Sequence, residues 1–179
     1  MTSVPEPTVR SVRAAQIISA ARRILEDEGR GALTMRRLAT EVGMQAPSLY
    51  KHFATKRAVE AALIEQGLFD FGEALHAAVS SPGVGGPVRS LLGAYRKTAL
   101  ANRALYRLAT SGRLPREDLA PNVEEWAGEP FLLAMSDPWR AQALLAFAHG
   151  MVVLELDDRF LEGSDLDVTW RAGSDMFAG

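Results

Sequence analysis

The sequence contains no cysteine among its 179 residues, which excludes disulfide bonds and cysteine-ligated zinc sites. No stretch approaches the 18 uninterrupted apolar residues of a membrane-spanning helix, and the first residues lack the apolar run of a signal peptide. We therefore expect a cytoplasmic protein with no membrane partner. Its three histidines, at positions 52, 76 and 149, offer no closely spaced helical pair of metal ligands, and we expect neither metal nor cofactor.

Sustained alternation of apolar and polar residues is also missing, whereas apolar residues recur with helical spacing, so the sequence predicts an all-α fold. The proline- and glycine-rich stretch SSPGVGGPV, residues 80–88, is the strongest break in that pattern. The net charge of −2 conceals an asymmetry, because residues 1–60 carry ten Lys/Arg against six Asp/Glu and residues 61–179 carry ten against sixteen. A basic first third suggests an anion-binding end.

Local signals predict a disordered tail over residues 1–10 and then four helices. An apolar stripe begins near Ser11 and stops at Gly29, which is suited to a helix C-terminus. Thr34 and Thr55 are expected to cap the second and fourth helices, and Pro47 to open the third while forcing the residue before it out of helical geometry. The four predicted helices span 11–28, 34–42, 47–53 and 55–79. Beyond the break, helices are expected over 88–110, 139–156 and 165–177, with short proline-interrupted pieces over 111–137.

The second and third helices, with Gly43 between them, form a helix-turn-helix over residues 34–53. In this motif the second helix enters the DNA major groove. Its inward positions are Leu49 and Phe53. The candidates for DNA contact are the outward residues Arg36, Gln45, Ala46, Pro47, Ser48, Tyr50, Lys51 and His52, together with Lys56 and Arg57 at the start of the next helix. The alternative is a plain helical hairpin with a solvated basic face.

The stretch LTMRRLATEVGMQAPSLYKHFATKRAVEAAL, residues 33–63, resembles the N-terminal domain of the tetracycline-repressor (TetR) family. The residues that carry the resemblance are Thr34, Arg36 or Arg37, Leu38, Ala39, Gly43, Leu49, Tyr50, His52, Phe53 and Lys56. Many members have glycine in place of Pro47, and many have a longer base-reading side chain in place of Ala46. The resemblance covers about residues 11–70.

This resemblance implies a DNA-binding transcriptional regulator that is not an enzyme. It assigns base contacts to Arg36, Gln45, Pro47 and Ser48, and phosphate contacts to Tyr50, His52 and Lys56. It further implies a homodimeric repressor that a small, largely apolar ligand releases from a palindromic operator in double-stranded DNA. The domain over residues 11–70 is then joined by a long helix to a helical ligand-binding and dimerisation domain over 71–179.

The C-terminal half offers candidates for both of its implied roles. Candidate ligand contacts are Phe71, Tyr95, Leu105, Tyr106, Trp126, Phe131, Met135 and His149, each of which could equally be a core residue. Candidate dimer contacts are Leu145, Val152, Leu156 and Trp170. Gly150 predicts a close helix crossing, and the run of residues 148–150, Ala-His-Gly, resembles a Trp-His-Gly pattern of one TetR subgroup with Ala148 in place of the tryptophan.

Enzyme motifs are incomplete in this chain. Ser48 and Lys51 match the Ser-x-x-Lys nucleophile pattern of β-lactamase-like enzymes, but the companion Ser-Asp-Asn is missing. The GVGG run at 83–86 is too short for a phosphate-binding loop. The alternative function kept open is an all-helical ligand-binding or protein-interaction module without DNA binding.

Overall fold

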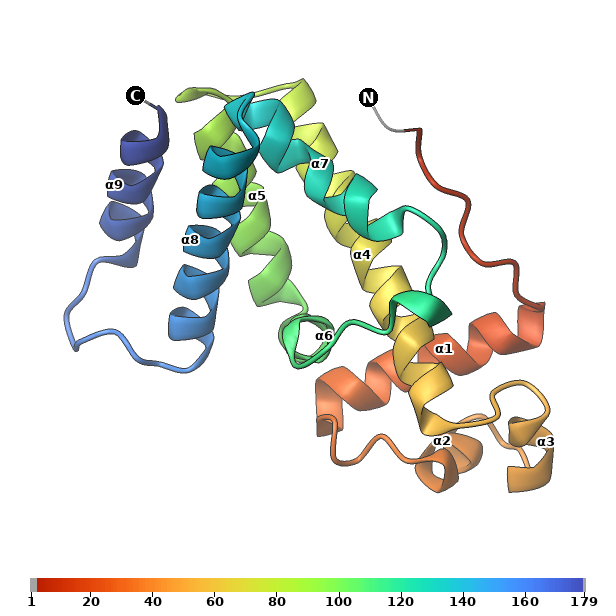
Figure 1. Cartoon of the computed structure of the whole chain (residues 1–179). Helices are drawn as coiled ribbons and strands as arrows, with labels where there is room; N and C mark the ends of the chain where they lie inside the picture. The colour runs from red at the N-terminus through yellow and green to blue at the C-terminus, as the bar shows by residue number, and fades with distance from the viewer. Residues whose placement is uncertain (1–2, 179) are drawn as a thin grey trace. The chain divides into compact units, whose positions relative to one another are not determined.

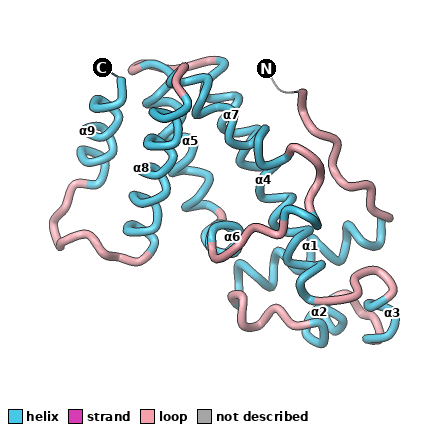
Figure 2. The backbone as a smooth tube through the Cα atoms, in the orientation of Figure 1, coloured by secondary structure: helices cyan, strands magenta, loops and turns pink. Residues whose placement is uncertain are grey.

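The computed structural model describes residues 3–178, and these form nine α-helices and one 3₁₀ helix without a strand, which confirms the all-α prediction (Figures 1 and 2). Among these residues, no helix combines the length and apolar character needed to cross a membrane. The elements are α1 Val12–Glu28, α2 Met35–Glu41, α3 Ala46–Tyr50, α4 Lys56–Ser80, α5 Gly86–Ala101, α6 Arg103–Thr110, η1 Arg116–Asp118, α7 Val123–Met135, α8 Pro138–Leu156 and α9 Leu166–Ala178.

The described chain divides into two compact units. The N-terminal unit consists of Val4–Leu68 and Asn102–Val123, and therefore holds α1 to α3, the first half of α4, α6 and η1. The C-terminal unit consists of Phe69–Ala101 and residues 124–178, which hold the rest of α4, α5, nearly all of α7, α8 and α9. The segment 102–123 thus belongs to the N-terminal unit, although its local sequence pattern does not indicate that it packs with residues 4–68.

Short-range caps set the boundaries of the first four helices as predicted. The Thr34 Oγ1 accepts a hydrogen bond from an amide three residues on, at 3.1 Å, and the Thr55 Oγ1 does the same for α4, also at 3.1 Å. Gly29 ends α1 with φ of +82°, a conformation that L-residues with side chains rarely adopt. The prediction of a helix over 47–53 was wrong at both ends, because α3 begins at Ala46 and ends at Tyr50. Pro47 takes the second position, where its missing N–H is still harmless.

A tertiary contact breaks the helix that the sequence predicts over 88–110. The Glu26 carboxylate of α1 accepts hydrogen bonds from the backbone amides of Ala104, at 3.1 Å, and Leu105, at 2.9 Å. An Arg22 nitrogen also donates to the Asn102 Oδ1 at 2.9 Å. These bonds give α6 its own N-terminal cap from another helix. The acidic end of α1, which is unfavourable to the dipole of its own helix, therefore stabilises the start of α6.

The expectation that prolines interrupt residues 111–137 is wrong for Pro130, which lies inside the 13-residue helix α7. A proline cannot donate to the carbonyl four residues earlier, here that of Trp126. The Nε2 of His76 on α4 lies 2.9 Å from this carbonyl oxygen, and since a carbonyl only accepts, Nε2 carries the proton. The imidazole ring also stacks on the Trp126 ring, with centroids 5.0 Å apart. One side chain thus supplies the donor that α7 lacks.

In the C-terminal unit, α5 packs against α8 and α9, and α8 packs against α9. Gly173 of α9 lies so close to the Phe147 ring that a Cβ there would come within 2.7 Å of two ring carbons. The close crossing predicted at Gly150 is not made among the described residues, because a Cβ at Gly150 would meet no atom within 4 Å.

Candidate nucleic-acid interface

The reading face of the helix-turn-helix is fixed by what its helices bury. Leu49 of α3 is fully buried and Phe53 is 7% exposed, and both belong to the core of the N-terminal unit, as do Leu38 and Ala39 of α2. Met35, Val42 and Met44 are partly buried against the same core, and the exposed side chains of this segment face away from it. The exposed ones are Arg36, Gln45, Ala46, Pro47, Tyr50, Lys51 and His52, while Ser48 is half-buried. The structure places these candidates on α2, on α3 and in the turns before and after α3 (Figure 1).

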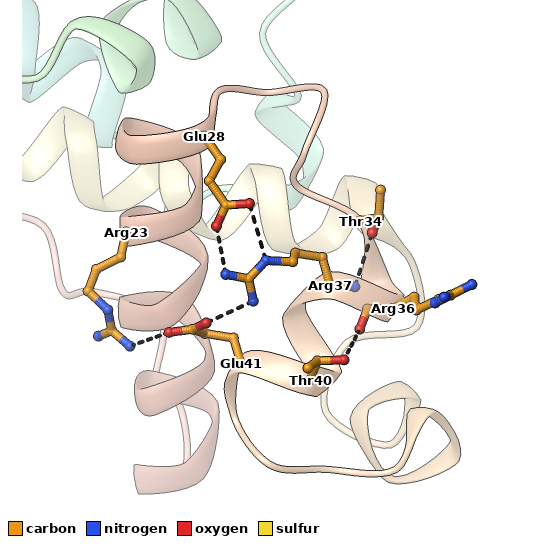
Figure 3. Close-up of polar contacts among 7 residues, drawn as sticks. All are labelled: Arg23, Glu28, Thr34, Arg36, Arg37, Thr40 and Glu41. Atoms are coloured by element: carbon orange, nitrogen blue, oxygen red, sulfur yellow. Dashed lines mark hydrogen bonds and ion pairs between the residues drawn. The ribbon is translucent and has the colours of Figure 1, made fainter.

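Two adjacent arginines of α2 have different roles (Figure 3). The Arg37 guanidinium contacts both oxygens of Glu28, at 2.6 and 3.2 Å, and the Glu41 carboxylate at 2.8 Å. Glu41 also pairs with Arg23 at 3.3 Å. Arg36 makes no side-chain hydrogen bond or ion pair with any residue that the structure describes, and its side chain extends away from this cluster in Figure 3. Of the two arginines, Arg36, the one that the sequence suggested for DNA contact, is therefore the cation that stays available, and its contact with DNA remains a prediction.

The pKa values of the cluster fit this division of roles. The hydrogen bonds that the guanidinium donates, first to Glu28 and then to Glu41, raise the pKa of Arg37 above its usual value. Hydrogen bonds from Arg37 and Arg23 lower the pKa of Glu41. Arg37 and Glu41 therefore hold opposite charges throughout the neutral pH range, and the bonds from Arg37 to Glu28 and from Arg23 to Glu41 fasten α2 to α1.

The cations at the start of α4 are partly engaged within the N-terminal unit. The Lys56 Nζ donates to the backbone oxygen of Arg30 at 3.2 Å and lies 3.6 Å from the Glu60 carboxylate, while its side chain keeps 39% of its surface exposed. Arg57 pairs with Glu117 and, at 3.5 Å, with Asp118 of η1. Lys56 thus remains a candidate for phosphate contact, whereas Arg57 is directed to η1.

Arg10 is also engaged within the N-terminal unit, since its guanidinium pairs with the buried Glu65 of α4 at 2.7 Å. The two Glu65 oxygens further accept the amide N–H of Thr8 at 3.2 Å, the Thr8 hydroxyl at 2.7 Å and the amide of Ala120 at 2.8 Å. Burial raises the pKa of Glu65, but hydrogen bonds from Arg10 and Thr8 outweigh it, so the pKa lies below its ordinary value. Sequence analysis missed this carboxylate, which joins residues 8–10, α4 and the loop before α7.

The candidate ligand contacts lie in both units. Leu105 belongs to the core of the N-terminal unit, and Tyr106 is buried in the same unit. In the C-terminal unit, the Tyr95 ring meets those of Phe71 and Phe131 edge to face, with centroids 5.6 and 5.7 Å apart. Trp126 and Met135 are buried there as well, and His149 is half-buried. Their role in binding a ligand stays a prediction.

The four candidate dimer contacts differ in exposure. Leu145 is 40% exposed on α8 and Leu156 is half-buried, whereas Val152 is fully buried and Trp170 is 6% exposed. Trp170 lies against Arg96, whose guanidinium carbon is 5.7 Å from the indole centroid. Val152 and Trp170 therefore stabilise the C-terminal unit and offer little surface to a partner.

An ion cluster that the sequence did not reveal holds three helices of the C-terminal unit together. Arg96 of α5 binds the Glu155 carboxylate of α8 through two nitrogens, at 2.8 and 2.9 Å, and Asp167 of α9 at 2.5 Å. The hydrogen bonds that Arg96 donates to Glu155 outweigh burial and raise the pKa of Arg96, with Asp167 adding to the effect. The two partners lie 59 and 71 residues from Arg96 in the sequence, so only the fold identifies them.

The helix-turn-helix region is similar in sequence to known proteins. Residues 17–63 match the model of the family described as bacterial regulatory proteins, tetR family. The tetracycline repressor protein class C of Escherichia coli is 49% identical over 49 residues, which cover 27% of this chain and 22% of that repressor. The match therefore spans about a fifth of that relative's length.

Solved structures resemble the chain over nearly its whole length. A protein of unknown function from Rhodococcus sp. RHA1 is 24% identical, with a TM-score of 0.78 and 97% of each chain covered. The multidrug binding protein EbrR, solved in complex with imidazole, is also 24% identical, with a TM-score of 0.69 and coverage of 93% of this chain and 96% of that one. At these identities the likeness establishes the fold.

The buried anchors, the caps and the outward face of α2 and α3 define a helix-turn-helix. The residues that form it lie within the stretch that matches the tetR family model, which confirms the resemblance drawn from residues 33–63. The likeness of residues 148–150 to one TetR subgroup stays a prediction.

Proposed function

We propose that the protein is a DNA-binding transcriptional regulator whose helix α3 enters the major groove. Base edges are then contacted by Arg36, Gln45, Pro47 and Ser48, and phosphates by Tyr50, Lys51, His52 and Lys56. The observation that carries the proposal is the outward face of α2 and α3, where Arg36 is available while the neighbouring Arg37 is neutralised by two carboxylates. The tetR-family domain supports it independently.

The test starts without knowledge of the operator. Affinity for random duplex DNA, measured by fluorescence anisotropy across a salt series, should fall steeply as salt rises, since each phosphate contact releases counterions. A flat salt response would favour the alternative, a ligand-binding or interaction module that does not bind DNA. Selection from a random duplex library then supplies the preferred sequence.

Two substitutions separate positioning from base reading. Lys56→Ala should weaken binding to all duplexes alike and reduce the salt slope by about one, whereas Ser48→Ala should change the selected sequence. Lys97→Ala on α5 removes the same charge from an exposed position outside the N-terminal unit, and serves as the control. A Lys56→Ala variant with altered preference and unaltered affinity would contradict this assignment.

We further infer that two copies form a homodimer through α8 and α9 and read a palindromic operator with half-sites about 34–36 Å apart, or a multiple of that spacing. Apolar side chains exposed on these helices support this, among them Leu145 at 40%, Leu154 at 41% and Val168 at 48%. Leu145→Glu should shift the sedimentation of the protein from dimer to monomer. Leu161→Glu, in the loop before α9, is the matched control and should leave the dimer intact.

We also propose that a small, largely apolar ligand binds the C-terminal unit and lowers the affinity for the operator. It does so by favouring another arrangement of the two helix-turn-helix motifs of the dimer. The support is the cluster of Phe71, Tyr95 and Phe131, and the drug-binding role in the name of EbrR. Operator affinity should fall in the presence of at least one member of a panel of hydrophobic compounds. Unchanged affinity across such a panel would contradict ligand release.

A further inference from the structure

A cavity of about 340 Å³ lies in the N-terminal unit, and its lining contains none of the candidate ligand residues and one candidate for DNA contact, Arg57. Its walls come from the connector after α1, from the first turns of α4, from the end of α6 with the loop that follows, and from η1. Its volume falls in the range of small-molecule sites. The lining residues are Arg30, Arg57, Glu60, Ala61, Ile64, Leu108, Ala109, Ser111, Arg113, Leu114, Pro115 and Glu117.

The polar wall of the cavity carries more positive than negative charge, with three arginines against two glutamates. Arg57 pairs with Glu117 and Arg30 with Glu60, the latter at 3.1 Å. Arg113 makes no hydrogen bond or ion pair with any residue that the structure describes. The side chains of Arg57 and Glu117 are 64% and 58% exposed, so their ion pair is screened by water and a competing carboxylate can replace Glu117 at little cost.

The opposite wall is apolar. Ala61, Ile64 and Leu108 are buried members of it, and Leu114 and Pro115 are half-buried. Inorganic phosphate or a DNA backbone would leave this wall without a partner. An organic acid with an apolar body satisfies both walls, because guanidinium groups bind carboxylates in a two-pronged geometry and the body covers apolar surface.

We propose that this cavity is a second ligand site, for a small aromatic or branched carboxylic acid whose carboxylate lies between Arg113, Arg57 and Arg30. Binding there has a direct route to the DNA face, and this part rests on the proposed function. Glu60 is shared between Arg30 and Lys56, whose Nζ lies 3.6 Å from it. A ligand carboxylate that takes the Arg30 guanidinium leaves Glu60 to Lys56, so the ammonium is withdrawn from DNA phosphate and operator affinity falls.

The site is tested first without DNA, on the full chain, with benzoate as the probe. Ligand-observed NMR titration should show benzoate binding, while neutral benzamide and inorganic phosphate should bind at least tenfold more weakly. Arg113→Gln should weaken benzoate binding about tenfold, since a hydrogen-bonded charge is lost. Arg159→Gln removes a charge from the exposed loop before α9 and should change nothing. Benzoate binding that is absent, or indifferent to Arg113→Gln, overturns the proposal.

A second variant, expected to strengthen benzoate binding, distinguishes a direct effect on the site from a general loss of structure. Glu117→Gln removes the carboxylate that occupies Arg57, so benzoate should bind two- to threefold more tightly than to the native chain; weaker binding would contradict the geometry. In a second arm, anisotropy with a selected duplex should show that benzoate lowers DNA affinity in the native chain and fails to do so in Arg113→Gln. If the protein does not bind DNA even in the absence of benzoate, the proposed function is refuted. If benzoate binds but leaves the DNA affinity unaltered, only the route through Lys56 is refuted.

Discussion

Replacing Glu65 by glutamine tests how strongly one buried carboxylate holds the N-terminal unit together. The Oε1 accepts the Thr8 amide and Arg10, and the Oε2 accepts the Thr8 hydroxyl and the Ala120 amide. A glutamine amide has one acceptor, so its NH₂ must face either Arg10 or Ala120, and neither can accept. The better orientation orphans the Ala120 N–H, at about 1–3 kcal/mol, and weakens the bond to Arg10. We expect a loss of about 2–3 kcal/mol in the free energy of unfolding at pH 7.

The pH dependence of this loss is a sharper test. Because hydrogen bonds hold the pKa of Glu65 below its ordinary value of 4.5, its stabilisation is complete above that pH and disappears as pH falls through the folded-state pKa. The difference between native and Glu65→Gln chains should therefore shrink at acid pH. All three tryptophans lie beyond residue 123, so urea unfolding is better followed by circular dichroism and by hydrogen exchange of the Ala120 amide. Glu73→Gln, exposed on the same helix, is the control. A pH-independent difference would refute the reasoning.

Three further expectations concern stability and binding. Gly72→Ala places a Cβ 2.6 Å from a ring carbon of a buried tryptophan and should destabilise the chain by about 1–3 kcal/mol, whereas Gly93→Ala, with open space, should stabilise it by up to about 1 kcal/mol in thermal unfolding. Glu26→Gln should speed hydrogen exchange at the first amides of α6, and protection equal to the native chain would contradict the cap. Arg36→Ala should weaken DNA binding without changing the melting temperature, while Arg37→Ala should lower the melting temperature.

The parts of the fold that sequence reasoning found are those decided within a few residues. Thr34 and Thr55 cap amides three positions away, and Gly29 needs only its own missing side chain, so these helix ends were predictable. The start of α6 was not, because its cap is a carboxylate 78 residues earlier in the chain. The sequence placed Arg36 on the outward face, but the ion pairs that engage Arg37 were hidden, since one of them depends on Glu28 in a different helix. Local chemistry predicted the elements, and tertiary contacts decided which charges remain available.

The bond between His76 and the carbonyl that Pro130 leaves without a helical donor also bears on how this chain can change over time. A residue with an N–H at position 130 would satisfy the carbonyl from within α7 and make the imidazole dispensable. Loss of the imidazole alone would instead orphan a carbonyl beside the Trp126 ring. In related sequences that keep this arrangement, we expect positions 76 and 130 to be substituted together. The missing donor at Pro130 and the histidine that replaces it are then kept or lost together during evolution.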